Sequence, residues 1–194
     1  MTPTKITQEQ KRILEKMQAG KKPTSTELTK VVTPVFNGMC INPKYVTKET
    51  TATRPTQTFV HTGNNKNLRR IGIPEGYGGW TSTWGKHKNK NTPKKAIYIN
   101  NEMSGTAQIV TLAHETGHVV MKDALQRDVG KRQAERKGHA MERVFADKFN
   151  DRYKSIGVEL DFGKSKSKFK PHRGDTELVK RNINPDYLKK GCRL

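Results

Sequence analysis

The chain has 194 residues, of which 31% are hydrophobic, and its 38 Lys and Arg against 18 Asp and Glu give a formal net charge of +20. This length fits one domain with a real core, and the low hydrophobic fraction indicates that tails or long loops add polar chain. No window approaches roughly eighteen consecutive apolar residues, and the amino terminus lacks the apolar core of a signal peptide. The composition therefore excludes a membrane protein and predicts a soluble, cytoplasmic one.

The excess of positive charge attracts polyanions. We therefore expect nucleic acid or another polyanion as a partner, bound through the basic surface and tail. The alternative is a lysine-rich surface that only keeps the protein soluble. The two cysteines, Cys40 and Cys192, lie near opposite ends of the chain and form no CxxC pair. They indicate free thiols in a reducing compartment.

The first predicted element is a short helix over residues 7–19. Thr7 and Gln10 fit a capping box, an apolar stripe follows at helical spacing, and Gly20 ends the pattern. The stripe predicts packing against a core.

From residue 21 to about 95 the apolar residues come in short pieces between Pro, Gly, Asn and Thr, which predict brief strands and loops. The pieces are 31–36, 58–60 and 71–73. Residues 77–84 then alternate aromatic with small polar residues, as a strand with one packed face does. A platform on which bases stack is the alternative interpretation of this stretch.

Two stretches concentrate positive charge without an acidic residue. Residues 86–95 hold five lysines, and residues 163–173 hold five Lys or Arg. The first stretch fits a solvated loop and a phosphate-contacting loop equally well, and the second suits a flexible arm on a phosphate backbone.

Residues 96–100 are typical of a strand and residues 106–125 of a helix, which carries His114 and His118 four positions apart. On a helix that spacing stacks both imidazoles on one face, so two ring nitrogens can reach one metal ion. Neutral imidazole is a good zinc ligand, and a catalytic zinc takes three protein ligands and keeps a fourth position for water. The pattern therefore predicts a zinc site.

Glu115 follows the first histidine directly. Attack on an amide needs a base that takes a proton from water and delivers it to the leaving nitrogen, and Glu115 fits that role. It is the one charged residue between Glu102 and Lys122. A lone carboxylate in so apolar a helix is costly unless something binds it or uses it.

The ten residues 111–120 resemble the extended signature of the zincin metallopeptidases, in which uncharged residues surround the two histidines and the glutamate. The branch with a Gly and a third His shortly after the motif is excluded, because Met121 and Ala124 occupy those positions. Among the other branches, the sequence is similar to the gluzincins, whose third ligand is a Glu on a later helix, or to the SprT-like group, whose third ligand is a later His. The resemblance covers roughly residues 95–155. It implies that the strand 96–100 is a sheet edge along which an extended peptide pairs.

A second long helix is predicted over residues 131–155. Glu142 falls on the same face as Phe145, and a carboxylate on a buried face needs a partner. Zinc is one such partner, and a salt bridge to a basic residue is the alternative. His139 lies at the edge of that face and is the ligand under the SprT-like interpretation, whereas Asp147 points away.

We expect a compact α+β zincin-like domain over residues 31–156, with a small sheet, an active-site helix and a third-ligand helix. A helical segment over residues 1–30 precedes it, and a basic tail over residues 157–194 follows.

The predicted function is zinc-dependent hydrolysis of peptide bonds in a protein or peptide substrate, with one Zn2+ per chain. His114, His118 and Glu142 bind the metal, Glu115 is the base, and Tyr153 is a candidate donor to the oxyanion. One alternative is a nucleic-acid-associated SprT-like protease. Another is a nucleic-acid-binding protein whose zinc site is structural or vestigial, which four protein ligands would favour.

Overall fold

The computed structural model describes residues 5–47, 56–87, 90–122, 124, 129–158 and 171–192, and only the backbone of 84–87 and 90–93. The elements of the described residues are, in chain order, α1 (Gln8–Gln18), α2 (Ser25–Gly38), β1 (Lys44–Val46), β2 (Gln57–Gly63), α3 (Asn65–Arg70), β3 (Gly79–His87), β4 (Lys90–Asn100), α4 (Gly105–Val120), α6 (Lys131–Tyr153), η1 (Lys154–Ile156), α7 (Asp175–Asn182) and η3 (Pro185–Tyr187). None of the described helices is long and apolar enough to cross a membrane.

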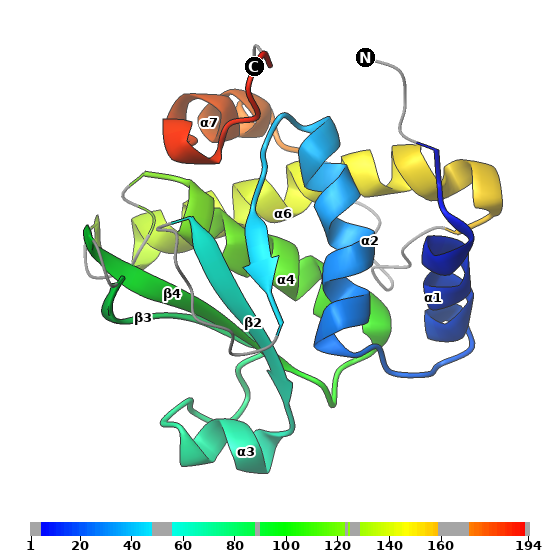
Figure 1. Cartoon of the computed structure of the whole chain (residues 1–194), viewed down its shortest axis with the longest axis horizontal. Coiled ribbons are helices and arrows are strands. Elements are labelled where there is room, and N and C mark those ends of the chain that lie inside the picture. Colours follow the sequence, from blue (N-terminus) through cyan, green and yellow to red (C-terminus); the bar gives the residue numbers. More distant parts are fainter. Residues whose placement is uncertain are drawn as a thin grey trace.

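The strands form one mixed sheet in the order β1-β2-β4-β3. β1, β2 and β4 run parallel, and β3 is antiparallel to β4. In Figure 1 the helices α4 and α6 lie together on one side of this sheet, with α2 and α1 beside them. The compact α+β architecture is the predicted one. The strand at residues 96–100 is confirmed as part of β4, but the expectation that it forms the sheet edge is wrong, because β3 lies outside it.

The helix α1 forms as its sequence predicts. Thr7 Oγ1 accepts a hydrogen bond from Gln10 N, and Gln10 Oε1 accepts one from Thr7 N. The apolar stripe of this helix is buried at Ile13 and Leu14. The capping box therefore fixes the start of a helix that packs on the core.

The helix α2 replaces the brief strand expected at residues 31–36. Thr24 and Glu27 form a second capping box at its start. Its buried apolar residues recur at helical spacing, at Leu28, Val31, Val32, Val35 and Phe36. β-branched side chains and the internal Pro34, which favour strands and loops, hide this period in the sequence.

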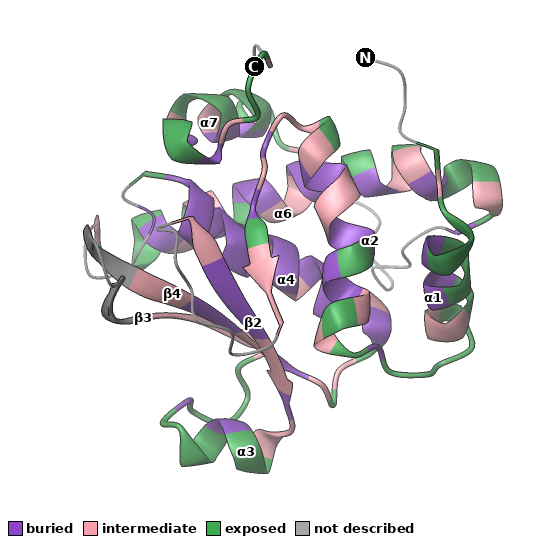
Figure 2. Ribbon diagram, in the orientation of Figure 1, coloured by how far each residue is buried: buried purple, intermediate pink, exposed green. Residues whose placement is uncertain are grey.

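Two other short pieces have different outcomes. Residues 58–60 lie in β2, as predicted. Residues 71–73 form no strand, because Ile71 is the C-terminal cap of α3 and is 54% exposed. The core instead joins α2, α4 and α6, with the rings of Phe36 and Phe145 4.8 Å apart. Figure 2 shows this buried layer along α2, α4 and the facing side of α6.

The C-terminal segment packs back onto the domain. Asp175, at the start of α7, accepts hydrogen bonds from Arg143 Nε and Nη2 at 2.7 and 3.1 Å. Farther along, Asn184 N donates to Val120 O at 2.9 Å, and Tyr187 is buried. The segment thereby holds the C-terminal end of α4 against α6.

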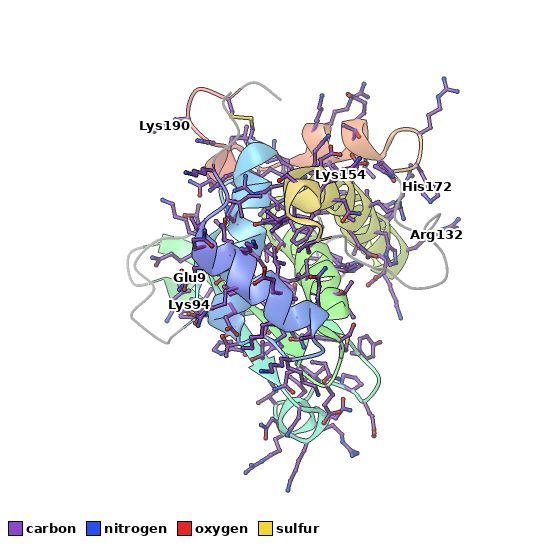
Figure 3. The ribbon with its side chains drawn as sticks, turned by 90° about the vertical axis from the view of Figure 1, so that its right-hand side faces the viewer. Glu9, Lys94, Arg132, Lys154, His172 and Lys190 are labelled. Carbon is purple, nitrogen blue, oxygen red and sulfur yellow. A yellow bond between two sulfur atoms is a disulfide. The ribbon has the colours of Figure 1, made fainter. Side chains whose placement is uncertain are left out.

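The two cysteines form a disulfide, so the prediction of free thiols is wrong. Ile41 and Leu188 form an isolated β-bridge, and Lys189 N donates to Cys40 O at 2.9 Å. These contacts bring Cys192 beside Cys40, with Cα atoms 5.6 Å apart although 152 positions separate them in the chain. Figure 3 shows the sulfur–sulfur bond near Lys190. The sequence positions of the two cysteines gave no indication of this contact.

Candidate metal centre

The helix α4 brings the two motif histidines together. Ser104 caps its start by accepting a hydrogen bond from Ala107 N, and nearly every later side chain of the helix is buried. His114 Nε2 and His118 Nε2 lie 3.1 Å apart. The four-residue spacing therefore places two ring nitrogens at one point, as the sequence predicts.

A carboxylate from α6 completes this group. Glu135 Oε2 lies 3.3 Å from His114 Nε2, and the ligand atoms of His114, His118 and Glu135 all lie within 4.8 Å of one another. Tetrahedral zinc with bonds of about 2.0–2.1 Å separates neighbouring ligand atoms by roughly 3.3 Å. The two separations from His114 Nε2, 3.1 and 3.3 Å, match that value, and the His118–Glu135 pair lies within 4.8 Å, so the donor set is consistent with a zinc ion.

The other nitrogen of each ring has a fixed acceptor. His118 Nδ1 donates to Ala124 O at 2.6 Å, and His114 Nδ1 donates to Glu142 Oε2 at 3.2 Å. A backbone carbonyl can only accept, so the Nδ1 of His118 carries the proton and its Nε2 lone pair stays available. Metal-binding histidines are commonly oriented by such acceptors on the far nitrogen.

Glu142, the predicted third ligand, lies on the opposite edge of the His114 ring. Its Oε2 also accepts from His139 Nδ1 at 3.2 Å, so His114, His139 and Glu142 make a second candidate group. That group uses Nδ1 of His114, whereas His118 meets Nε2. The two groups therefore place a metal on different sides of one ring, and Glu142 as a ligand stays a prediction.

Two glycines allow α4 and α6 to approach at the site. A Cβ on Gly138 would lie 2.6 Å from Cε1 and Nε2 of His114, and a Cβ on Gly117 would lie 2.8 Å from Met141 Cβ. Neither position has room for a side chain. The close crossing of the helices thus depends on glycine at both positions, and it is what brings Glu135 within reach of the histidines.

The charges of the site are strongly coupled. Burial alone would lower the pKa of His114, but its hydrogen bonds with Glu135 and Glu142 outweigh burial and raise that pKa to about 9. Burial raises the pKa of Glu142, and the hydrogen bonds from His114 and His139 overcome it, which leaves that pKa at about 2. Burial and the neighbouring His114 charge lower the pKa of His118. A protonated His114 thus balances two carboxylates.

Glu115 lies beside the histidines and faces the edge strand. It is 7% exposed, and its Oε2 accepts a hydrogen bond from Thr81 Oγ1 at 2.6 Å. Burial raises the pKa of Glu115, while the charge of His114 and the Thr81 hydroxyl oppose that rise. A cavity of about 440 Å³ opens over these groups, with Tyr77 and Trp80 on one wall and Lys131 on another.

Several predicted residues lie elsewhere. Tyr153 is fully buried and donates to Val31 O at 3.0 Å, so its assignment to the oxyanion is wrong. Lys95 Nζ donates to Val119 O at 2.7 Å and is a structural contact of α4. The other lysines of 86–95 lie mostly where side chains are not described, and residues 163–170 lie outside the described residues. Nucleic-acid binding therefore stays a prediction.

Sequence reasoning missed Glu135 and Thr81. Glu135 lies three, four and seven positions before Gly138, His139 and Glu142, so all four share one face of α6. A search of that face for carboxylates would have found it. Thr81 has no local signal, because its contact with Glu115 depends on how β3 packs against α4.

The fold and the site resemble those of the zincin metallopeptidases, because a later helix of this α+β domain brings a carboxylate to the two HExxH histidines. Residues 78–149 match the profile of Peptidase_M78, described as the IrrE N-terminal-like domain. This stretch spans every residue of the candidate centre and confirms the resemblance to HExxH zincin metallopeptidases. No curated protein and no solved structure matches the chain.

Proposed function

We propose that the protein is a zinc-dependent peptidase that hydrolyses peptide bonds with Glu115 as general base. One observation carries the proposal, the convergence of two histidine nitrogens and a carboxylate at ligand spacing beside a second carboxylate, Glu115, under an open cavity. A structural zinc site is closed by four protein ligands, whereas a catalytic site keeps one position open. Three protein donors facing a cavity fit the catalytic arrangement.

The ligand set we propose is His114, His118 and Glu135. Both histidines offer Nε2 to it, and the Nδ1 of each is already held by an acceptor. Glu142 then orients His114 from the far side of the ring. This assignment gives every charged group of the centre a partner, whereas Glu142 as the ligand would leave His118 outside the coordination sphere.

Zinc held by these residues would polarise the scissile carbonyl and make water acidic enough to attack it at neutral pH. Glu115 Oε1 or Oε2 accepts the proton of the attacking water and returns it to the leaving nitrogen. Burial suits this role, because it brings the pKa of the carboxyl upward toward the working pH.

The edge strand supports a peptide as the substrate. Among the strands that the structure describes, β3 pairs with β4 alone, and its residues Gly79 and Thr81 line the cavity. The free edge of a strand offers backbone N–H and C=O groups to an extended peptide. Backbone pairing of this kind would place a peptide bond across the cavity with little demand on its sequence.

The test uses the purified chain loaded with one equivalent of zinc and an unstructured protein such as casein as substrate. We expect cleavage by the wild type, none by Glu115→Gln, and about one zinc per chain in both, because the base is not a ligand. His118→Ala should lose zinc as well as activity. Wild-type turnover in Glu115→Gln would contradict the mechanism, and a zinc-loaded wild type that cleaves no protein would contradict the function.

A further inference from the structure

The carboxylate of Glu115 depends on one neighbour for its position. A glutamate has three rotatable side-chain bonds, and a general base must stay within hydrogen-bond reach of the proton that it takes. Among the described residues, Thr81 alone makes a hydrogen bond to this carboxylate, with Oγ1 2.6 Å from Oε2. That length is in the range of an O–H group donating to a charged oxygen.

Thr81 is suited to hold the carboxylate in a fixed place. It is the third residue of β3, and its partner Ile97 in β4 is fully buried. A β-branched side chain in a strand has a restricted χ1, so the hydroxyl is fixed relative to the sheet. The same oxygen lies 3.2 Å from Glu115 O, so it contacts both the backbone and the side chain of Glu115.

Gly79, two residues earlier on the same face of β3, bounds the carboxylate on its other side. A Cβ at this position would lie 2.4 Å from Thr111 Cγ2, 2.9 Å from Glu115 Cγ and 3.0 Å from Glu115 Oε1. The bare backbone therefore lets β3 come close enough to α4 for the Thr81 hydroxyl to reach Oε2. Strand and glutamate form one packed unit.

We propose that Thr81 is the positioning residue of the general base, which holds the Glu115 carboxylate toward the metal centre. The inference rests on the proposed function for its kinetic consequence, while the Thr81–Glu115 contact can be measured without catalysis. Misplacing a catalytic group by about 1 Å can lower a rate by roughly a hundredfold. Among the described residues, the hydrogen bonds of the Thr81 hydroxyl go to Glu115 and not to the proposed metal ligands, so its loss should act on turnover.

The kinetic test compares Thr81→Val, which keeps the shape of the side chain and removes the hydroxyl, with Thr81→Ser, which keeps the hydroxyl. We expect Thr81→Val to lower kcat by about tenfold to a hundredfold with KM changed less than about threefold, and Thr81→Ser to restore kcat to within about threefold. Ser82→Ala removes a hydroxyl from the opposite face of the same strand and should match the wild type. Zinc affinity should be the same in all four proteins.

The second test needs no activity. A double-mutant cycle of Thr81→Val and Glu115→Gln on zinc-free protein, measured by urea unfolding, should give a coupling distinct from zero, because the hydroxyl donates to a charged oxygen only in the wild type. A wild-type kcat in Thr81→Val, or a cycle that closes at zero, would overturn the proposal. A zinc-loaded wild type without peptidase activity would overturn the proposed function, and the cycle would still decide the contact.

Discussion

The metal centre and the C-terminal clasp, which we define as residues 175–192 with Arg143 and Cys40, bury charged groups in opposite ways. In the clasp, the two carboxylate oxygens of Asp175 accept from Nε and Nη2 on one edge of the Arg143 guanidinium, and a disulfide closes the segment. In the centre, three glutamates lie around His114, and, against the effect of burial, its pKa is raised to about 9 mainly by its hydrogen bonds with Glu135 and Glu142. The charged groups of the clasp pair with each other, whereas the groups of the candidate centre are arranged as they would be around a metal cation.

This contrast predicts a double dissociation. Substitutions in the clasp should lower the free energy of unfolding and leave zinc affinity unchanged. Substitutions of the groups around His114 should act chiefly on zinc affinity. The following changes test it, in order of the expected size of the effect.

Breaking the ion pair of the clasp should have the largest effect. Arg143→Met leaves Asp175 buried without its guanidinium, which should lower the free energy of unfolding by about 3–5 kcal/mol. Denaturant unfolding of zinc-free protein measures it. Lys148→Met is the matched control on the same helix, because its exposed pairs with Asp147 and Asp151 should contribute less than about 1 kcal/mol. Equal losses of unfolding free energy in the two variants would contradict the prediction that the buried ion pair contributes more than the exposed ones.

Opening the disulfide should come next. Cys40→Ser with Cys192→Ser should lower the free energy of unfolding by about 2–5 kcal/mol, chiefly because the unfolded chain gains freedom. Zinc affinity of the folded protein should stay within about twofold of the wild type. A reductant should destabilise the wild type by a similar amount and leave the double variant unchanged. A loss of zinc binding on reduction would contradict this prediction, because it would show that zinc affinity depends on the clasp.

Adding a side chain where α4 and α6 cross should weaken zinc binding. The Cβ of Gly138→Ala would lie 2.6 Å from Cε1 and Nε2 of His114, so the ring must shift from its present position. We expect zinc affinity to fall by about tenfold or more, a loss comparable to that of a displaced supporting group. Gly38→Ala, at a helical glycine with open space around it, should leave the affinity unchanged. Competition with a chelating dye measures both, and equal affinities would contradict the crowding.

The pH dependence of the clasp should be smaller and confined to acid. Burial raises the pKa of Asp175, but the hydrogen bonds from Arg143 and His172 N outweigh it and hold that pKa below its ordinary 3.8. A carboxyl with a lowered folded pKa stabilises the protein above its unfolded pKa, and the stabilisation is lost as the pH falls through the folded pKa. The stability difference between the wild type and Asp175→Asn should therefore be constant above about pH 5 and shrink below 3.8. A difference that grows toward acid would contradict the assignment.

Local signals in the sequence predicted the elements that depend on neighbours along the chain. The capping box at Thr7, the helix with His114 and His118, and the exposed direction of Asp147 all follow from spacing. The helix α2 could also have been predicted, because Thr24 and Glu27 repeat the same capping pattern. Its β-branched residues favoured a strand instead and hid the helical spacing of the apolar residues.

Contacts between distant segments could not be predicted in the same way. The disulfide depends on the C-terminal segment folding back, and the partner of Glu115 depends on the register of β3 against α4. The choice between Glu135 and Glu142 depends on which nitrogen of His114 each one meets, because both lie on one face of α6. A helical wheel shows on which face of a helix a residue lies. Which nitrogen of His114 the side chain contacts depends on how the two helices pack.

The zinc dissociation constants of Glu135→Gln and Glu142→Gln, measured side by side with a competing chelator, test the central claim most directly. The account predicts that Glu135→Gln weakens zinc binding by more than about a hundredfold, because a ligand is lost. Glu142→Gln should weaken it by roughly tenfold, because only the support of His114 is lost. Both amides keep the size of the side chain, so packing is unchanged. The reverse order would contradict the account and make Glu142 the ligand.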